Sequence, residues 1–344
     1  MRSPKIIYLI TRTHGLKEHL LKSEDFFRIL RAKNIVEIYD LLSNSDYSIE
    51  LSKIPIIDFD VYQLEKIFYQ KLSQRSSFLL QITSGKTREV LEDYYRKIEI
   101  ENIKRITRAT HANEKISEDQ LIPIPRKYQT VNFPALLESQ NIREMIDLLK
   151  ESPYRDLRER VDLYEKYNNP LILEAQIDKI YYESLWEKLE EIVDKDEVKD
   201  LIGTEIDLKN LLYVLSLKHM KIERELLQEI IINIHYKLSG SLIQQLVDAP
   251  YETIPELLTW PSYVELAKKA VELIGREMVT EAENIFSQHF YSYAETVALR
   301  NPNNLVYVFA YLHLCFREAR NLTTLTIGKH LKIDEEKIRS SLSL

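Results

Sequence analysis

The sequence is poor in the residues that cross-link or interrupt a helical chain. Its 344 residues include one cysteine, six glycines and 11 prolines. The lone cysteine, Cys315, has no partner for a disulfide, which favours a reducing compartment. The scarcity of glycine and proline disfavours a protein of strands and tight turns and favours helices joined by short connections. The sequence therefore predicts an all-α fold.

Long apolar runs and an excess of positive charge are also missing. The longest stretch without a charged residue, residues 301–316, contains several asparagines and is too short for a membrane span. No succession of residues typical of a secretory signal opens the sequence, so we expect a soluble chain that is not secreted. The net charge of −7 argues against a nucleic-acid-binding protein.

The sequence motifs that could indicate nucleotide binding, metal binding or thiol catalysis are incomplete. The run Ser84-Gly85-Lys86-Thr87 matches the end of a phosphate-binding loop, but Leu80 stands where such a loop needs an earlier glycine. The eight histidines show no metal-ligand spacing. His313 lies two positions from Cys315, and such neighbours point in different directions on a helix. We therefore expect no catalytic, cofactor-binding or metal-binding residues.

The main positive feature is an internal repeat. Residues 34–42 followed by Tyr47 resemble residues 141–149 followed by Tyr154, at a constant offset of 107 positions. A weaker third copy and two further motifs recur in the same order: Leu242, Leu246, Pro250 and Tyr251; residues 64–69, 177–182 and 282–286; and Asn102, Asn210 and Asn321. This order predicts three similar helical lobes, over residues 1–111, 112–218 and 219–344, in a pseudo-threefold arrangement.

Apolar periodicity and capping residues predict the helices within these lobes. Asp58 and Asp60 can cap a helix whose apolar face would consist of Val61, Leu64, Ile67, Phe68 and Leu72. Gly203 and Asp207 are expected to interrupt the chain before a helix over residues 208–217. Asn102, Asn210 and Asn321 are expected to be helix caps or buried hydrogen-bond partners, with contacts to another protein as the alternative.

Charge is spread unevenly over the three lobes. Lys and Arg counted against Asp and Glu give +4 for residues 1–111, −8 for 112–218 and −3 for 219–344. Either the solvated faces have diverged, or the lobes meet different partner surfaces. Under the second interpretation Lys104, Arg105 and Arg108, which share one predicted helix of the basic lobe, are candidates to meet an acidic partner.

The closing segment resembles a known family. Glu318-Ala319-Arg320-Asn321-Leu322, then Gly328-Lys329, then Ile338-Arg339-Ser340-Ser341-Leu342 are similar to the ending of the C subunit of archaeal A-type and related V-type rotary ATPases, whose eukaryotic relative is the d subunit. The tripled helical pattern agrees with this resemblance over essentially the whole chain. The family often has a basic residue two positions after the motif asparagine; Lys104 keeps it, whereas Leu212 and Thr323 depart from it.

The resemblance implies a funnel of three helical lobes, with its wide side on the membrane proteolipid ring and its hollow around the central shaft of the D and F subunits. It implies a non-catalytic rotor subunit of the central stalk that couples shaft and ring during proton or sodium transport. Such a protein is peripheral, at the cytoplasmic face of the cell membrane. The candidate partner-binding residues are Lys104, Arg105, Arg108, Arg320 and Lys329. The alternatives are a helical-repeat adaptor or scaffold unrelated to rotary ATPases and, less favoured, an enzyme with a dispersed site.

Overall fold

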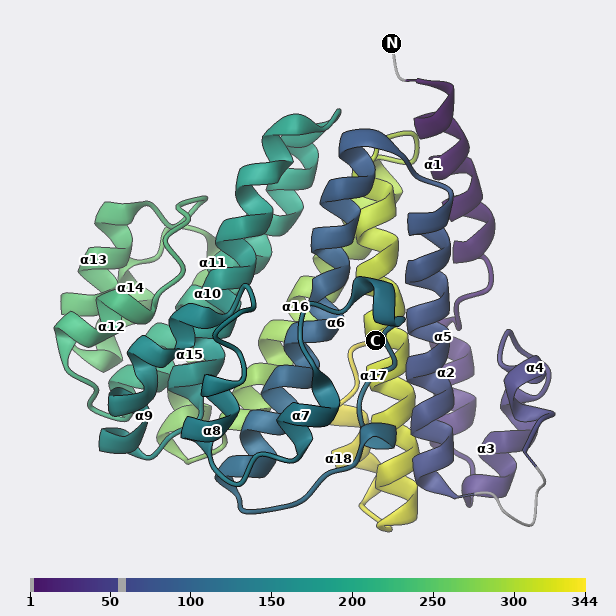
Figure 1. Ribbon diagram of the computed structural model, residues 1–344, viewed down its shortest axis with the longest axis horizontal. Helices are drawn as coiled ribbons and strands as arrows, with labels where there is room; N and C mark the ends of the chain where they lie inside the picture. The colour runs from purple at the N-terminus through teal and green to yellow at the C-terminus, as the bar shows by residue number, and fades with distance from the viewer. Residues whose placement is uncertain (1–2, 55–59) are drawn as a thin grey trace. The chain divides into compact units, whose positions relative to one another are not determined.

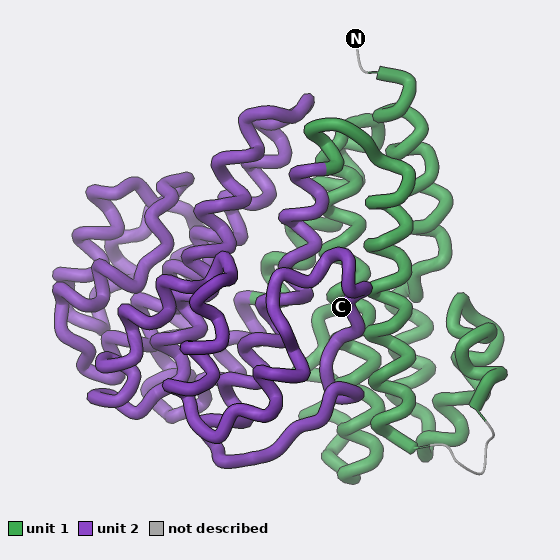
Figure 2. The backbone as a smooth tube through the Cα atoms, viewed as in Figure 1, with its two compact units in different colours: residues 1–88, 287–344 green, residues 89–286 purple. Residues whose placement is uncertain are grey.

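The computed structural model describes residues 3–54 and 60–344, and all regular elements within these ranges are helices (Figure 1). The predicted all-α class is therefore confirmed. The described chain divides into two compact units, residues 1–88 with 287–344 and residues 89–286 (Figure 2). The first unit joins the two ends of the chain, so the compact units and the three sequence repeats are divisions of different kinds.

The first unit is built on two long helices that pack along each other, α5 (Val61–Gln81) and α17 (Val306–His330). The helix α1 (Pro4–Lys17) packs on both. The shorter helices are α2 (Ser23–Leu30), α3 (Ile35–Leu42), α4 (Ser48–Leu51) and α18 (Glu335–Ser340), and α16 (Val279–Arg300) contributes its C-terminal part.

The helix α5 begins and packs as its sequence predicts. The Asp60 side chain accepts a hydrogen bond from the backbone N–H of Gln63 at 2.8 Å and so caps the first turn. The five predicted apolar-face residues of α5 are all buried: Val61, Leu64, Ile67, Phe68 and Leu72. The other predicted cap, Asp58, lies outside the described residues.

The second unit contains the long helices α10 (Leu171–Lys188) and α11 (Lys195–His219), most of α6 (Gly85–His111), and α15 (Pro261–Gly275). Its short α-helices are α7 (Phe133–Leu137), α8 (Ile142–Asp147), α9 (Val161–Tyr167), α12 (Arg224–Ile230), α13 (Gly240–Asp248) and α14 (Ile254–Leu257). Short 3₁₀ helices lie at Glu118–Gln120, Arg126–Tyr128, Arg155–Arg160, Leu189–Glu191 and Tyr251–Thr253.

The predicted interruption at Gly203 and Asp207 is wrong, because α11 continues through both residues. Each residue serves a tertiary contact instead. A Cβ atom at Gly203 would lie 2.5 Å from the Cγ atom of Tyr236, so the glycine allows that ring to pack against the helix. Asp207 is fully buried and accepts a hydrogen bond from the backbone N–H of Lys237 at 2.9 Å.

The strongest sequence repeat recurs as a repeated local structure. Asn34 caps α3 by accepting from the N–H of Glu37 at 3.0 Å, and the Glu37 carboxylate accepts from the N–H of the residue before the cap at 2.8 Å. Asn141 and Glu144 make the same two bonds at the start of α8, also at 3.0 and 2.8 Å. These reciprocal bonds form a variant of the capping box, in which the acid binds the N–H one position before the cap rather than that of the cap itself, and they fix the first turn of the helix. The offset of 107 residues therefore reflects repeated structure.

Candidate partner-binding surface

Three of the candidate partner-binding residues lie on α6, in the second unit. Lys104 and Arg108 are one helical turn apart and face two buried acids of α10, Asp178 and Glu174. The Nζ atom of Lys104 lies 2.5 Å from Oδ1 of Asp178, and the Lys104 side chain is only 5% exposed. Lys104 is therefore a buried member of an ion pair, and its charge is used within the fold.

Asp178 is the centre of a buried charge cluster. Its second carboxylate oxygen contacts Nζ of Lys209 at 2.8 Å and accepts a hydrogen bond from the hydroxyl of Tyr213, both on α11. Burial alone would raise the pKa of Asp178, but Lys104 and Lys209 outweigh it and hold that pKa below its usual value. The cluster therefore joins α6, α10 and α11 with a carboxylate that stays ionised.

The guanidinium of Arg108 pairs with a buried acid, but much of the Arg108 side chain is accessible to solvent. Its guanidinium donates from Nε to Oε1 of Glu174 at 2.7 Å and from Nη2 to Oε2 at 2.5 Å, a two-point ion pair. The Arg108 side chain is nevertheless 54% exposed, whereas that of Glu174 is 9% exposed. Arg105 is half-buried and donates from Nη1 to the carbonyl of Gln120 at 2.8 Å. Part of the basic face of α6 is thus accessible, and its role toward a partner stays a prediction.

The other two candidates lie on α17, in the first unit. Arg320 is half-buried and donates to the hydroxyl of Ser287 at 2.8 Å. Lys329 is 14% exposed, and its Nζ atom lies 3.6 Å from a carboxylate oxygen of Glu335 at the start of α18. Both are engaged in contacts within their own unit, and their role toward a partner also stays a prediction.

The three motif asparagines are buried hydrogen-bond partners, as one of the predicted alternatives stated. All three lie inside long helices rather than at helix ends, so they are not caps. Each side chain both donates to the carbonyl and accepts from the N–H of one distant residue: Asn102 with Ile122, Asn210 with Ile232 and Asn321 with Ser343, at 2.8 to 3.0 Å. This pairing gives both the oxygen and the nitrogen of each buried amide a hydrogen-bond partner.

Sequence reasoning noted Glu318 in the closing motif but missed that an acid accompanies the other two asparagines as well. Glu99, Asp207 and Glu318 each stand three positions before the asparagine, so all three long helices carry the pattern Glu/Asp-x-x-Asn. All three acids are buried. Alignment of the repeats on the asparagines would have revealed this pattern, because an acid one turn away on the same face recurs in every copy.

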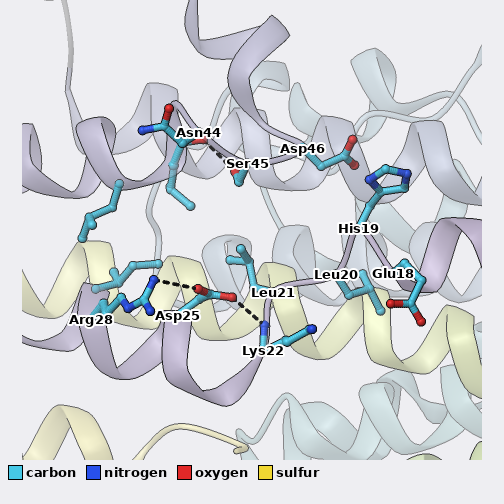
Figure 3. Close-up of a pocket in the computed structure, with 13 residues that line it drawn as sticks. Glu18, His19, Leu20, Leu21, Lys22, Asp25, Arg28, Asn44, Ser45 and Asp46 are labelled. Carbon is cyan, nitrogen blue, oxygen red and sulfur yellow. Dashed lines mark hydrogen bonds and ion pairs between the residues drawn. The ribbon is translucent and has the colours of Figure 1, made fainter.

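A cavity of about 390 Å³ in the first unit is lined by charges of both signs (Figure 3). Asp25, on its wall, accepts from the backbone N–H of Lys22 at 3.0 Å and lies 3.7 Å from the guanidinium of Arg28. Asp46, also on the wall, contacts Arg75 at 2.9 Å. These acids are bound to groups of the protein itself, so the cavity presents no charge of one sign to a ligand.

Two further features limit the chemistry of the described residues. Within residues 3–54 and 60–344, no three His, Cys, Asp or Glu side chains are grouped so that they could hold a metal ion. The same ranges contain no helix that is both long and apolar enough to cross a membrane. The fold and the contacts together describe an all-α protein of repeated helices that are joined by buried polar contacts.

The chain belongs to the ATP synthase (C/AC39) subunit family, whose model matches residues 9–341. The resemblance carried by the closing segment is therefore confirmed. Among similar proteins, the C subunit of the A-type ATP synthase of Methanococcoides burtonii is 25% identical over 99% of this chain and 94% of its own length. The proteins of the same name from Methanosarcina mazei and Archaeoglobus fulgidus are 24% and 23% identical over 99% and 97% of this chain, and 93% and 95% of their own lengths.

Proposed function

We propose that this chain is a non-catalytic rotor subunit of the central stalk of an A/V-type ATP synthase. In this role it couples a shaft of D and F subunits to the membrane proteolipid ring during proton or sodium transport. The observation that carries the proposal is the family match over residues 9–341, together with relatives named as the C subunit of A-type ATP synthases that align over nearly their whole length. The chain is expected at the cytoplasmic face of the cell membrane as a peripheral protein.

The internal contacts support this role. A rotor component must transmit torque, so its helices must not slide past one another. The buried cluster around Asp178 ties three long helices together, because Lys104 comes from α6 and Lys209 and Tyr213 come from α11. Breaking such a buried cluster would leave an unpaired charge, which costs about 3–5 kcal/mol. This resistance suits a mechanical part better than an adaptor of loosely stacked repeats.

Co-purification tests the proposal. The tagged chain would be expressed in its source organism and recovered from detergent-solubilised membranes, with an unrelated tagged protein as the control. We expect the proteolipid of the ring and both shaft subunits to be recovered in fixed ratio with the chain. Binding to isolated ring and to isolated shaft would then be measured separately. A partner set that lacks ATP synthase components would favour the adaptor alternative.

The basic face of α6 offers a second test, at the level of residues. We propose that the accessible sides of Arg105 and Arg108 meet an acidic surface on the shaft or the ring. Arg105→Glu should weaken that binding at low salt and less at about 1 M salt, where the Debye length is only about 3 Å. Arg105→Gln should give a smaller effect, because it removes the charge without reversing it.

Arg143→Glu is the matched control for these variants. Arg143 lies in the same unit as Arg105, is 57% exposed, and is engaged within that unit by Asp162 and Glu165. Thermal unfolding of each variant would verify that the fold is retained. If Arg105→Glu and Arg143→Glu change binding equally, the α6 surface has no specific role, although the rotor proposal itself would stand.

A further inference from the structure

The acids of the Glu/Asp-x-x-Asn pattern make the same pair of contacts in all three helices. Each accepts a hydrogen bond from at least one backbone N–H and one from a tyrosine hydroxyl: Glu99 from Thr130 (2.7 Å) and Tyr154 (3.0 Å), Asp207 from Lys237 (2.9 Å) and Tyr263 (3.4 Å), and Glu318 from Leu21 (2.6 Å) and Tyr47 (2.7 Å). Tyr251, which the sequence aligned with Tyr47 and Tyr154, instead donates to the carbonyl of Val271 at 3.4 Å. The third tyrosine of the series is therefore Tyr263.

We call each acid with its asparagine a joint. In the joints of α6 and α11, the two residues bound by the acid and the asparagine belong to one short segment of the chain. Asn102 holds Ile122 and Glu99 holds Thr130, eight positions later in the chain. In α11 the held residues, Ile232 and Lys237, are five positions apart. At these two joints the peptide chain itself keeps the bound residues near each other.

The joint of α17 holds two segments that are far apart in the sequence. Asn321 binds Ser343, next to the last residue, and Glu318 binds Leu21 near the beginning. No peptide connection links these bound residues except the rest of the protein. Tyr47, which also donates to Glu318, places the segment after α3 on the same carboxylate.

We infer that Glu318 and Asn321 form a closing joint, which holds the N-terminal segment to the C-terminal helix where the other two joints have a covalent connection. An ion pair distinguishes it. Nη1 of Arg75 lies 2.6 Å from Oε1 of Glu318, and Nη2 lies 2.9 Å from Asp46, with the Arg75 and Glu318 side chains 5% and 3% exposed. Among the described residues, neither Glu99 nor Asp207 has a cationic side chain within ion-pair distance. The inference rests on these contacts and is independent of the proposed function.

The closing joint has a specific consequence for local opening. Leu21 and Tyr47 can leave α17 only when their bonds to Glu318 break, and the chain links their segment to α1 and α5 rather than to α17 itself. The segments at Thr130 and Lys237, in contrast, directly follow the helices that hold them. Backbone amides exchange with solvent according to the free energy of such local openings. Weakening Glu318 should therefore release a long segment, and weakening Glu99 only a short one.

Hydrogen exchange of the whole chain tests this difference. Glu318→Gln removes the charge that faces Arg75, so exchange in residues 20–51 should rise by about tenfold or more. Glu99→Gln should raise exchange only around residues 122–137. Glu295→Gln, which breaks a more exposed pair with Arg317 in the same unit, is the control and should leave residues 20–51 unchanged. A change of less than about twofold at residues 20–51 in Glu318→Gln would overturn the inference.

A circular permutant provides a second, independent test. Leu344 would be joined to Met1 by a Gly/Ser linker of about 20 residues, which spans about 25 Å on average, and new ends would be opened between Glu114 and Lys115. Both of these residues are exposed. The connection across the α17 joint is then covalent, and the connection across the α6 joint is not.

In the permutant, we expect Glu99→Gln rather than Glu318→Gln to cause the larger rise in hydrogen exchange. In the permutant Glu99→Gln should raise exchange over a long segment from residue 115 onward, and Glu318→Gln should act only locally. Unchanged sensitivity at Glu318 would contradict the closing joint.

Discussion

The joints of Glu318 in the first unit and Asp207 in the second have the same plan but different charge balance. Both acids are buried, and both accept a backbone N–H and a tyrosine hydroxyl. Glu318 also has the guanidinium of Arg75, whereas Asp207 relies on hydrogen bonds from neutral groups and on the more distant charge of Lys237. The two helices therefore share the hydrogen bonds to a buried acid, but they differ in the groups that stabilise the charge of that acid.

The difference appears in the ionisation of the two joints. Burial alone would lower the pKa of Arg75, but Glu318 outweighs it, so the pKa of Arg75 lies above its usual value and the guanidinium stays charged. At the other joint, burial raises the pKa of Asp207 to about 6, because the two backbone N–H groups and Lys237 compensate only in part. The first unit thus has a joint whose acid faces a permanently charged arginine, and the second has one whose acid titrates near pH 6.

The largest expected effect comes from removing the cation. Arg75→Met leaves the carboxylate of Glu318 buried without its charge partner, and such a loss costs about 3–5 kcal/mol of unfolding free energy. Arg143→Met, which removes a pair on the surface, should cost at most about 1 kcal/mol. Urea unfolding of both variants measures the difference. A loss below about 1.5 kcal/mol for Arg75→Met would mean that the two joints do not differ as their ion pairing indicates.

The second prediction concerns pH at the uncompensated joint. The folded pKa of Asp207 is about 6, against 3.8 for the unperturbed group, so the folded state binds more protons between these values than the unfolded state does. Stability from this group therefore falls as pH rises from about 4 to about 6, by up to about 3 kcal/mol at 1.36 kcal/mol per pKa unit. It is constant above this window.

Comparison with Asp207→Asn isolates this contribution, because the variant cannot titrate. The difference in unfolding free energy between the natural protein and the variant should change across pH 4–6 and be flat above it. A pH-independent difference for Asp207→Asn would show that its carboxyl is ionised as readily as an exposed one.

Some of this structure could be predicted from the sequence, and the reasons are local. The capping boxes at Asn34 and Asn141 depend on residues three or four positions apart, so their repetition was visible as a sequence repeat. The burial of the α5 face followed from helical periodicity in the same way. Both kinds of signal are complete within a few residues.

The errors arose where a residue serves a distant part of the chain. Gly203 and Asp207 look like helix breakers by propensity, but the glycine accommodates the ring of Tyr236 and the acid holds Lys237. Tyr251 matched its counterparts by sequence, whereas Tyr263 makes the corresponding contact. Lys104 was readable as a basic residue, yet its pairing with Asp178 depends on how α6 and α10 pack. Tertiary contacts decided each case.

A smaller effect is expected from the tyrosine hydroxyls. Tyr47→Phe and Tyr154→Phe each remove a hydrogen bond to a buried carboxylate, which contributes about 1.5–3 kcal/mol. Tyr251→Phe, whose hydroxyl meets a backbone carbonyl at 3.4 Å, should cost at most about 0.5–1 kcal/mol. Chemical unfolding of the three variants ranks them. Equal losses at Tyr47, Tyr154 and Tyr251 would show that a hydroxyl bonded to a buried carboxylate contributes no more than one bonded to a backbone carbonyl.

The smallest effects should be the most alike. Asn34→Ala and Asn141→Ala each remove a cap whose two hydrogen bonds have the same lengths in the two copies, although α3 lies in the first unit and α8 in the second. Each substitution should lower the unfolding free energy by about 1 kcal/mol, and Asn→Asp at either site should recover most of the loss because Asp is an equally good cap. Since a capping box is a local structure, the two losses should agree within about 0.5 kcal/mol even though the joints of the two units differ in charge balance. A clearly larger loss at Asn34 would show that the cap of α3 also supports Tyr47 at the closing joint, and that the two copies are no longer mechanically equivalent.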